Sequence, residues 1–105
     1  MLQAPIPATE RPARRSAFSV DAIDLFEVNE AFACVPMAWA KALGADVAKL
    51  NVNGGACALG HPLGGTGAKL MSTLVSEMVR RRARFGLQAI CEGGGTANAM
   101  IVERC

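Results

Sequence analysis

The stretch NGGACALGHPLGGTG, residues 53–67, decides how the rest of this chain is interpreted. It places His61, the only histidine of the protein, in a turn rich in glycine. Glycine permits tight turns and lets backbone N–H groups approach a ligand closely. Such a run can therefore present a proton-exchanging side chain beside an oxyanion site. A buried histidine next to glycines that serve only as turns fits the run equally well.

A second glycine-rich turn, CEGGGT at residues 91–96, begins with Cys91. A histidine and a cysteine, each carried by such a turn, are the groups that acyl transfer on thioesters requires. His61 could polarise a thioester oxygen or accept the proton of a thiol, and Cys91 could be a nucleophile or a proton carrier. On its own, Cys91 is better explained as a small hydrophobic residue at the end of a strand.

A third candidate segment, NEAFA at residues 29–33, follows a predicted strand. Loops at the carboxyl ends of strands gather ligands in α/β sheets, so we expect the three segments to converge. Asn29 could position a water or donate its amide to a carbonyl oxygen. Its alternative role is to cap the helix that follows it.

The composition indicates one globular domain over residues 1–105. Hydrophobic residues make up 51% of the chain and charged residues 19%, and the net charge of +2 is too small to indicate a nucleic-acid partner. No apolar run is long enough to cross a membrane, and no signal peptide is visible. We therefore expect a cytoplasmic protein with four reduced cysteines and with no membrane or nucleic-acid partner.

Neither a metal site nor a nucleotide loop is expected. A zinc site would need ligands beyond the pair Cys57 and His61, with spacings that the sequence does not show. Residues 60–67 lack the Gly-Lys-Ser/Thr ending of a phosphate-binding loop.

Strand-like and helix-like hydrophobic patterns alternate along the chain, which predicts a layered α/β domain. A helix over 67–84 carries a broad apolar stripe, and Gly86 is expected to end it. Pro12 is expected to shorten or distort a helix near the N-terminus, and Pro36 to kink a second helix by freeing the carbonyl of Phe32. The other predicted elements are a strand over 23–28, the kinked helix over 31–43 closed by Gly44, and strands over 49–52, 87–91 and 99–103.

Together these segments resemble the C-terminal end of the thiolase family. Residues 29–33 resemble its NEAF motif, and residues 91–95 resemble its CxGGG block. Residues 54–67 resemble its GGAxAxGHPxGxSG block, with Thr66 where serine is common. The resemblance covers nearly the whole chain. It implies a thiolase-like C-terminal half, a layered α/β/α fold with a mixed sheet that lacks its first strand.

The resemblance also implies catalytic roles for two residues. His61 would activate the nucleophilic cysteine of the enzyme and help to bind the thioester oxygen. Cys91 would be the general acid/base that protonates or deprotonates the leaving or attacking carbon. A coenzyme A thioester would be the substrate, and no cofactor is implied.

Four further positions receive roles from the same resemblance. Asn29 would hold the water that completes the first oxyanion hole, and the backbone N–H of Gly93 would contribute to a second one. Ala31 and Phe32 would line the acyl pocket. The related decarboxylating ketoacyl synthases have a histidine where thiolases have the NEAF asparagine. The only histidine of this chain is already placed at His61, which favours a thiolase.

Three parts of the family pattern are absent from the chain: the nucleophilic cysteine of the N-terminal half, the loop that covers coenzyme A, and the first strand of the C-terminal half. The missing strand would leave a sheet edge unpaired and prone to association. The helix over 67–84 resembles one that is buried between the two halves. We therefore expect an N-terminal thiolase half or subunit as partner, an oligomer, and an inactive chain when that partner is missing.

The leading hypothesis is the C-terminal part of a thiolase that transfers acyl groups between 3-ketoacyl-CoA or acetyl-CoA and coenzyme A. The alternative is a non-catalytic, truncated thiolase-like assembly module. A third hypothesis is a free-standing hydrolase with Cys91 as nucleophile and His61 as base.

Overall fold

The computed structural model describes residues 3–15, 19–62, 64–92 and 96–105. In chain order, the helices and strands are α1 (Pro5–Arg15), a 3-10 helix (Val20–Ala22), β1 (Leu25–Val28), α2 (Cys34–Leu43), a second 3-10 helix (Val47–Lys49), α3 (Ala56–Leu59), α4 (Thr66–Arg81), β2 (Phe85–Glu92) and β3 (Thr96–Glu103).

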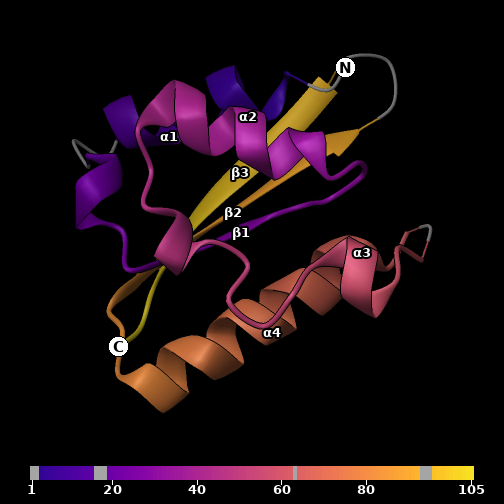
Figure 1. Cartoon of the computed structure of the whole chain (residues 1–105). Helices are drawn as coiled ribbons and strands as arrows, with labels where there is room; N and C mark the ends of the chain where they lie inside the picture. Colours follow the sequence, from indigo (N-terminus) through magenta and orange to yellow (C-terminus); the bar gives the residue numbers. More distant parts are fainter. Residues whose placement is uncertain (1–2, 16–18, 63, 93–95) are drawn as a thin grey trace.

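The strands form one mixed sheet in the order β1-β2-β3. Strand β1 runs parallel to β2, with Phe26 opposite Leu87, and β2 runs antiparallel to β3, with Leu87 opposite Ile101. Helices α1 and α2 cover one face of the sheet and α4 covers the other (Figure 1). The predicted α/β class with a mixed sheet is therefore confirmed.

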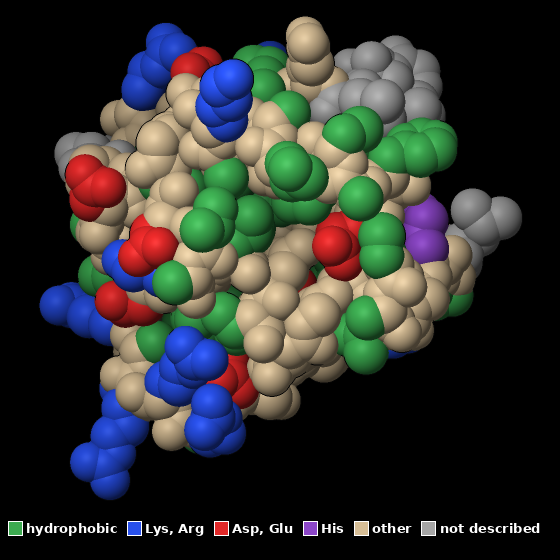
Figure 2. Space-filling model, viewed as in Figure 1, with side chains coloured by type: hydrophobic (Ala, Val, Ile, Leu, Met, Phe, Trp, Pro, Cys, Tyr) green, Lys and Arg blue, Asp and Glu red, His purple; other side chains and the backbone are tan. Residues whose placement is uncertain are grey.

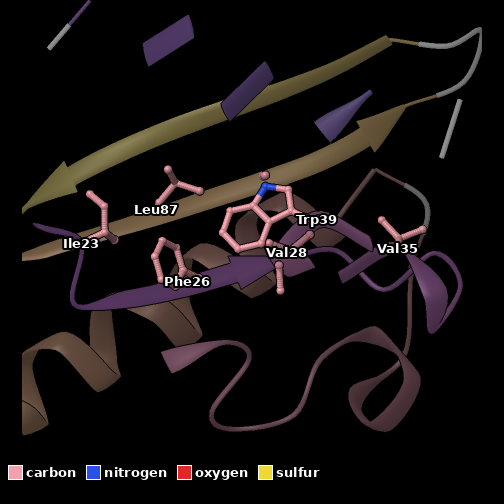
Figure 3. Packing of buried hydrophobic residues seen from close by; sticks show 8 residues of the cluster. Ile23, Phe26, Val28, Val35, Trp39 and Leu87 are labelled. Carbon is pink, nitrogen blue, oxygen red and sulfur yellow. The ribbon is translucent and has the colours of Figure 1, made fainter. Parts of the chain in front are cut away.

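The core on the α1 and α2 side is built around Trp39. Its ring lies edge-on to Phe26, with the ring centroids 5.1 Å apart (Figure 3). Its indole Nε1–H donates to Thr9 Oγ1 at 2.8 Å, and the Thr9 hydroxyl donates to the carbonyl of Pro5 at 2.8 Å. Thr9 and Trp39 are both buried, so this chain of two hydrogen bonds attaches α1 to α2 without contact with water.

Replacing Thr9 by valine should therefore destabilise the protein. The buried indole N–H would lose its acceptor, which costs about 1–3 kcal/mol of unfolding free energy. Urea denaturation followed by tryptophan fluorescence measures the change, because Trp39 is the only tryptophan. Thr9→Ser keeps the hydroxyl and should lose much less. Equal losses in both variants would contradict the role given to this hydrogen bond.

The core on the other face joins α4 to the sheet through Leu25, Leu74 and Met78. Gly86 of β2 lies under this helix, and a Cβ atom there would come 2.6 Å from the sulfur of Met78. The prediction that Gly86 ends the helix is wrong. Helix α4 ends at Arg81, and Arg82 follows in the left-handed conformation with φ +57°. Gly86 instead allows the helix to approach the sheet closely.

Two details of the predictions about proline are wrong: the shortening at Pro12 and the freed carbonyl at Pro36. The N-terminal helix is not short, because it runs for 11 residues from Pro5 and continues through Pro12. The second helix begins at Cys34, so Pro36 lies in its first turn, where a backbone N–H is not needed. The Phe32 carbonyl is not freed either, because it accepts from the N–H of Val35 at 3.0 Å.

The strand predicted over 49–52 is not formed. A 3-10 helix ends at Lys49, and Leu50 makes only an isolated bridge to Phe26. Asn51 then adopts φ +47° and turns its side chain to the free edge of β1. Its Oδ1 accepts from the N–H of Val28 and its Nδ2 donates to the carbonyl of the same residue, both at 2.9 Å. The carboxamide therefore covers part of this edge of β1.

Candidate active site

His61 and Cys91, which are 30 residues apart in the sequence, line the same surface hollow of about 350 Å³. One side of the hollow comes from the turn that leads into α4, and the other from the end of β2 and the start of β3. The described lining residues are His61, Pro62, Gly64, Thr66, Gly67, Ile90, Cys91, Glu92 and Asn98. The fold thus brings together two of the three predicted segments.

His61 is exposed at the surface, where it is the purple side chain of Figure 2. Its Nδ1 lies 2.5 Å from Oγ1 of Thr66, the first residue of α4. Gly60 and Gly64 on either side have φ of +93° and +75°, a conformation that residues with a Cβ rarely adopt. The glycines therefore shape the turn that presents the imidazole, and the alternative of a buried histidine is excluded.

Cys91 is half-buried near the end of β2. None of the four cysteines, all of which are described, forms a disulfide. Over the described part of the chain, no three His, Cys, Asp or Glu side chains are grouped as a metal site would need. No described helix is long and apolar enough to cross a membrane.

Asn29 directly follows β1 and is 1% exposed. Its N–H donates to the carbonyl of Ala89 on the neighbouring strand at 2.9 Å. It does not cap the next helix, because the residue at that position is Ala33 and no side-chain cap bond is formed there. Neither Oδ1 nor Nδ2 of Asn29 has a hydrogen-bond partner among the described residues. A buried amide without a partner costs stability, which is typical of a functional position.

Four predicted site residues are not seen at the hollow, three of them described and one not. Asn29, Ala31 and Phe32 are not among its described lining residues. Ala31 and Phe32 lie in the turn between β1 and α2, and Phe32 is 57% exposed. Gly93, the predicted contributor to a second oxyanion hole, lies outside the described residues.

Glu30 joins the Asn29 segment to the glycine-rich stretch. Its carboxylate accepts from the N–H of Cys57 at 3.4 Å, and the Cys57 thiol donates to the Glu30 carbonyl at 3.8 Å. A side chain at position 55 would overlap the Glu30 carboxylate, so Gly55 is required for this contact. The sequence analysis missed both Glu30 and Asn51, because each acts on a segment more than 20 residues away.

A buried carboxylate anchors the first residue of the glycine-rich stretch. Glu77 of α4 accepts from Asn53 Nδ2 at 3.0 Å and also from the guanidinium groups of Arg80 and Arg81. Hydrogen bonds from Arg80, Asn53 and Arg81 hold the pKa of Glu77 well below its usual range. The start of the stretch is thereby attached to the same helix that begins with Thr66.

Glu27 and Gln88 form a buried polar pair in the sheet. They face each other across β1 and β2 and are 2% and 5% exposed. Oε2 of Glu27 and Oε1 of Gln88 have no hydrogen-bond partner among the described residues. Burial, with a smaller contribution from the negative charge of Glu30, raises the pKa of Glu27 from 4.5 to about 7.

The pKa of Glu27 predicts how stability changes with pH. Between pH 4.5 and about 7 the folded protein holds a proton that the unfolded chain has released, so the free energy of unfolding should fall as the pH rises through this range. Urea denaturation at a series of pH values measures it. Glu27→Gln should remove this component, whereas Glu103→Gln at an exposed position should keep it. An unchanged pH profile in Glu27→Gln would contradict the assignment.

Comparison with known proteins finds a family model and curated relatives that match nearly the whole chain. The family model described as Thiolase, C-terminal domain, matches residues 1–104. Steroid 3-ketoacyl-CoA thiolase FadA6 of Mycobacterium tuberculosis is 58% identical over 104 residues, which are 99% of this chain and 26% of that protein. Acetyl-CoA acetyltransferase of Escherichia coli is 47% identical over 100 residues, and the cytosolic acetyl-CoA acetyltransferase of Mus musculus is 46% identical over 100 residues. In both cases 95% of this chain and 25% of the relative are covered. The chain thus spans about a quarter of the length of these curated relatives.

Proposed function

Because the chain belongs to the thiolase family, as its C-terminal domain, we propose that it supplies the acid–base half of an acyl-transfer site. The complete site would move acyl groups between 3-ketoacyl-CoA or acetyl-CoA and coenzyme A. The observation that carries the proposal is the single hollow lined by His61 and Cys91. It joins a proton acceptor and a thiol that are 30 residues apart in the sequence.

His61 and Cys91 have separate tasks in this proposal. His61 takes the thiol proton of a nucleophilic cysteine and then helps to bind the oxyanion formed when the thiolate attacks the 3-keto carbon. The bond between C2 and C3 breaks, and the Cys91 thiol gives its proton to the departing carbon, which yields acetyl-CoA. The Cys91 thiolate then takes the thiol proton of coenzyme A, whose sulfur attacks the acyl-enzyme, and the departing nucleophilic cysteine takes its proton back from His61.

The other predicted residues complete the proposed site. Asn29 holds a water at the first oxyanion hole, which agrees with its buried amide that has no partner among the described residues. The N–H of Gly93 contributes to the second hole, and Ala31 and Phe32 line the acyl pocket. The exposure of Phe32 agrees with a pocket wall that a further part of the enzyme covers.

We propose that the nucleophilic cysteine comes from an N-terminal thiolase part, as a separate subunit or a preceding segment. The outer face of α4 supports such a partner, because Val75 and Val79 are 44% and 62% exposed one turn apart. Apolar side chains repeated along a helix need cover, and a partner supplies it. The assembled enzyme would be cytoplasmic and oligomeric.

Complementation tests this function. The chain is expressed together with the N-terminal part of steroid 3-ketoacyl-CoA thiolase, and thiolysis is measured with acetoacetyl-CoA and with a steroid 3-ketoacyl-CoA. We expect a stable complex with turnover that requires both parts. A complex that forms without turnover would contradict the catalytic proposal and favour an assembly module.

A further inference from the structure

Thr66 makes two polar contacts at the beginning of α4, and its side chain is nearly buried at 4% exposure. Its Oγ1 lies 2.5 Å from Nδ1 of His61 and 2.9 Å from the carbonyl oxygen of Pro62. At both distances the two polar atoms can approach only with a hydrogen between them. A hydroxyl has one hydrogen to donate, so it can be the donor in only one of the two contacts.

The direction of each bond follows from the chemistry of the acceptors. The Pro62 carbonyl oxygen can only accept, so the Thr66 hydrogen must lie between these two oxygens. Without it, two acceptor atoms would face each other at 2.9 Å. Thr66 Oγ1 therefore accepts from His61, and this requires a hydrogen on Nδ1. In a neutral imidazole, a hydrogen on Nδ1 leaves Nε2 as an unprotonated acceptor.

The backbone fixes this arrangement. The Pro62 carbonyl also accepts from the N–H groups of Gly65 and Thr66, at 3.1 and 3.2 Å, which closes the turn before α4. Because Thr66 is held by its own helix and by Pro62, the imidazole contact does not depend on a mobile partner. Among the described residues none forms a hydrogen bond with Nε2 of the ring, and the ring lines the hollow shared with Cys91.

We propose that Thr66 is a positioning residue that holds His61 in the Nδ1–H tautomer and leaves Nε2 ready to accept a proton. In the reaction proposed above, the S–H bond of the nucleophilic cysteine breaks, its electron pair stays on sulfur, and the proton binds Nε2. Nδ1–H stays bonded to Thr66 as the ring becomes positive. This consequence rests on the proposed function, whereas the tautomer itself does not.

Nitrogen-15 NMR of the purified chain tests the tautomer directly. His61 is the only histidine, so the two-bond couplings between ring hydrogens and ring nitrogens come from one imidazole. At about pH 9, where imidazoles are neutral, we expect a protonated Nδ1 and an unprotonated Nε2. A spectrum dominated by the Nε2–H tautomer in the wild-type chain would overturn the proposal. No substrate or partner is needed, so this result is independent of the thiolase activity.

Three variants separate positioning from stability. Thr66→Ser keeps the hydroxyl and should keep the Nδ1–H spectrum, whereas Thr66→Val has nearly the same shape and should lose it. Thr73→Val is the matched control, because the Thr73 hydroxyl also donates to the carbonyl four residues earlier, that of Lys69, at 3.0 Å. We expect the control to leave the tautomer unchanged. An unchanged tautomer in Thr66→Val, or the same change in Thr73→Val, would overturn the role of Thr66.

The assembled enzyme provides a second readout. Thr66→Val should lower kcat by about tenfold with little change in KM, because only proton acceptance by the ring is impaired. Thr66→Ser should restore most of the rate. A rise in KM at constant kcat would instead assign Thr66 to substrate binding and contradict the proposal.

Discussion

Replacing His61 by alanine should lower kcat of the assembled thiolase by about 10²- to 10⁴-fold, which is the range that positioned acid–base groups contribute. The imidazole is exposed in the hollow and contacts Thr66 and not the core, so the fold should survive its removal. Stopped-flow or steady-state thiolysis of acetoacetyl-CoA measures the rate, and circular dichroism checks the fold.

Asn98 provides the control for this experiment, because it lines the same hollow but has no chemical role in the proposal. Asn98→Ala should retain most of the rate. If His61→Ala kept the wild-type rate, or if Asn98→Ala lost as much, the assignment of His61 as proton acceptor would be wrong.

Replacing Gly86 by alanine should destabilise the fold by about 1–3 kcal/mol, the usual cost of adding a methyl group to a filled core. The new Cβ would lie 2.6 Å from Met78 Sδ and 3.1 Å from Leu74 Cδ1, so α4 would have to move away from β2. Small domains are stable by only about 5–15 kcal/mol, so the loss would be a large fraction of the total. Urea denaturation at pH 7 measures it.

A second substitution tests whether crowding is the cause. Adding Met78→Ala to Gly86→Ala vacates the space that the new methyl group needs. The double variant should therefore lose less than the sum of the two single losses. Strict additivity, or a Gly86→Ala protein as stable as the wild type, would show that Gly86 is not needed for close packing.

The sequence predicted α4 well because its signal is local. Leu70, Leu74 and Met78 recur at helical spacing, and all three are buried. Its end was missed because Gly86 was interpreted as a helix stop. Arg82 takes the left-handed conformation there, and the reason for Gly86 lies in Met78, eight residues earlier in sequence and in contact only after the sheet forms.

The segment 49–52 shows what a local pattern cannot provide. Its apolar alternation is typical of a strand, but Asn51 bonds both main-chain groups of Val28 through its side chain. This contact depends on the position of β1, 23 residues earlier, and no local pattern encodes it. The proline errors have a similar cause, because the effect of Pro36 depends on where its helix begins.

The site shows the same difference between what a local pattern predicts and what depends on distant contacts. His61 and Cys91 were singled out from their residue types and their glycine-rich turns, and the structure brings them to one hollow. The contacts of Glu30 with Cys57, of Asn51 with Val28 and of Thr66 with His61 are specific pairings that appear only in the folded chain. The sequence therefore predicted which two groups would share a site, but not the residues that hold the neighbouring segments.

Intact-mass spectrometry after mixing with acetyl-CoA tests the central claim, that this chain holds the acid–base groups and not the nucleophile. The chain is measured alone and together with an N-terminal thiolase part. We predict an acetyl adduct on the cysteine of the N-terminal part, formed only when both parts are present, and an unmodified Cys91. An acetyl group on Cys91 of the chain alone would contradict the account and show a self-sufficient cysteine enzyme.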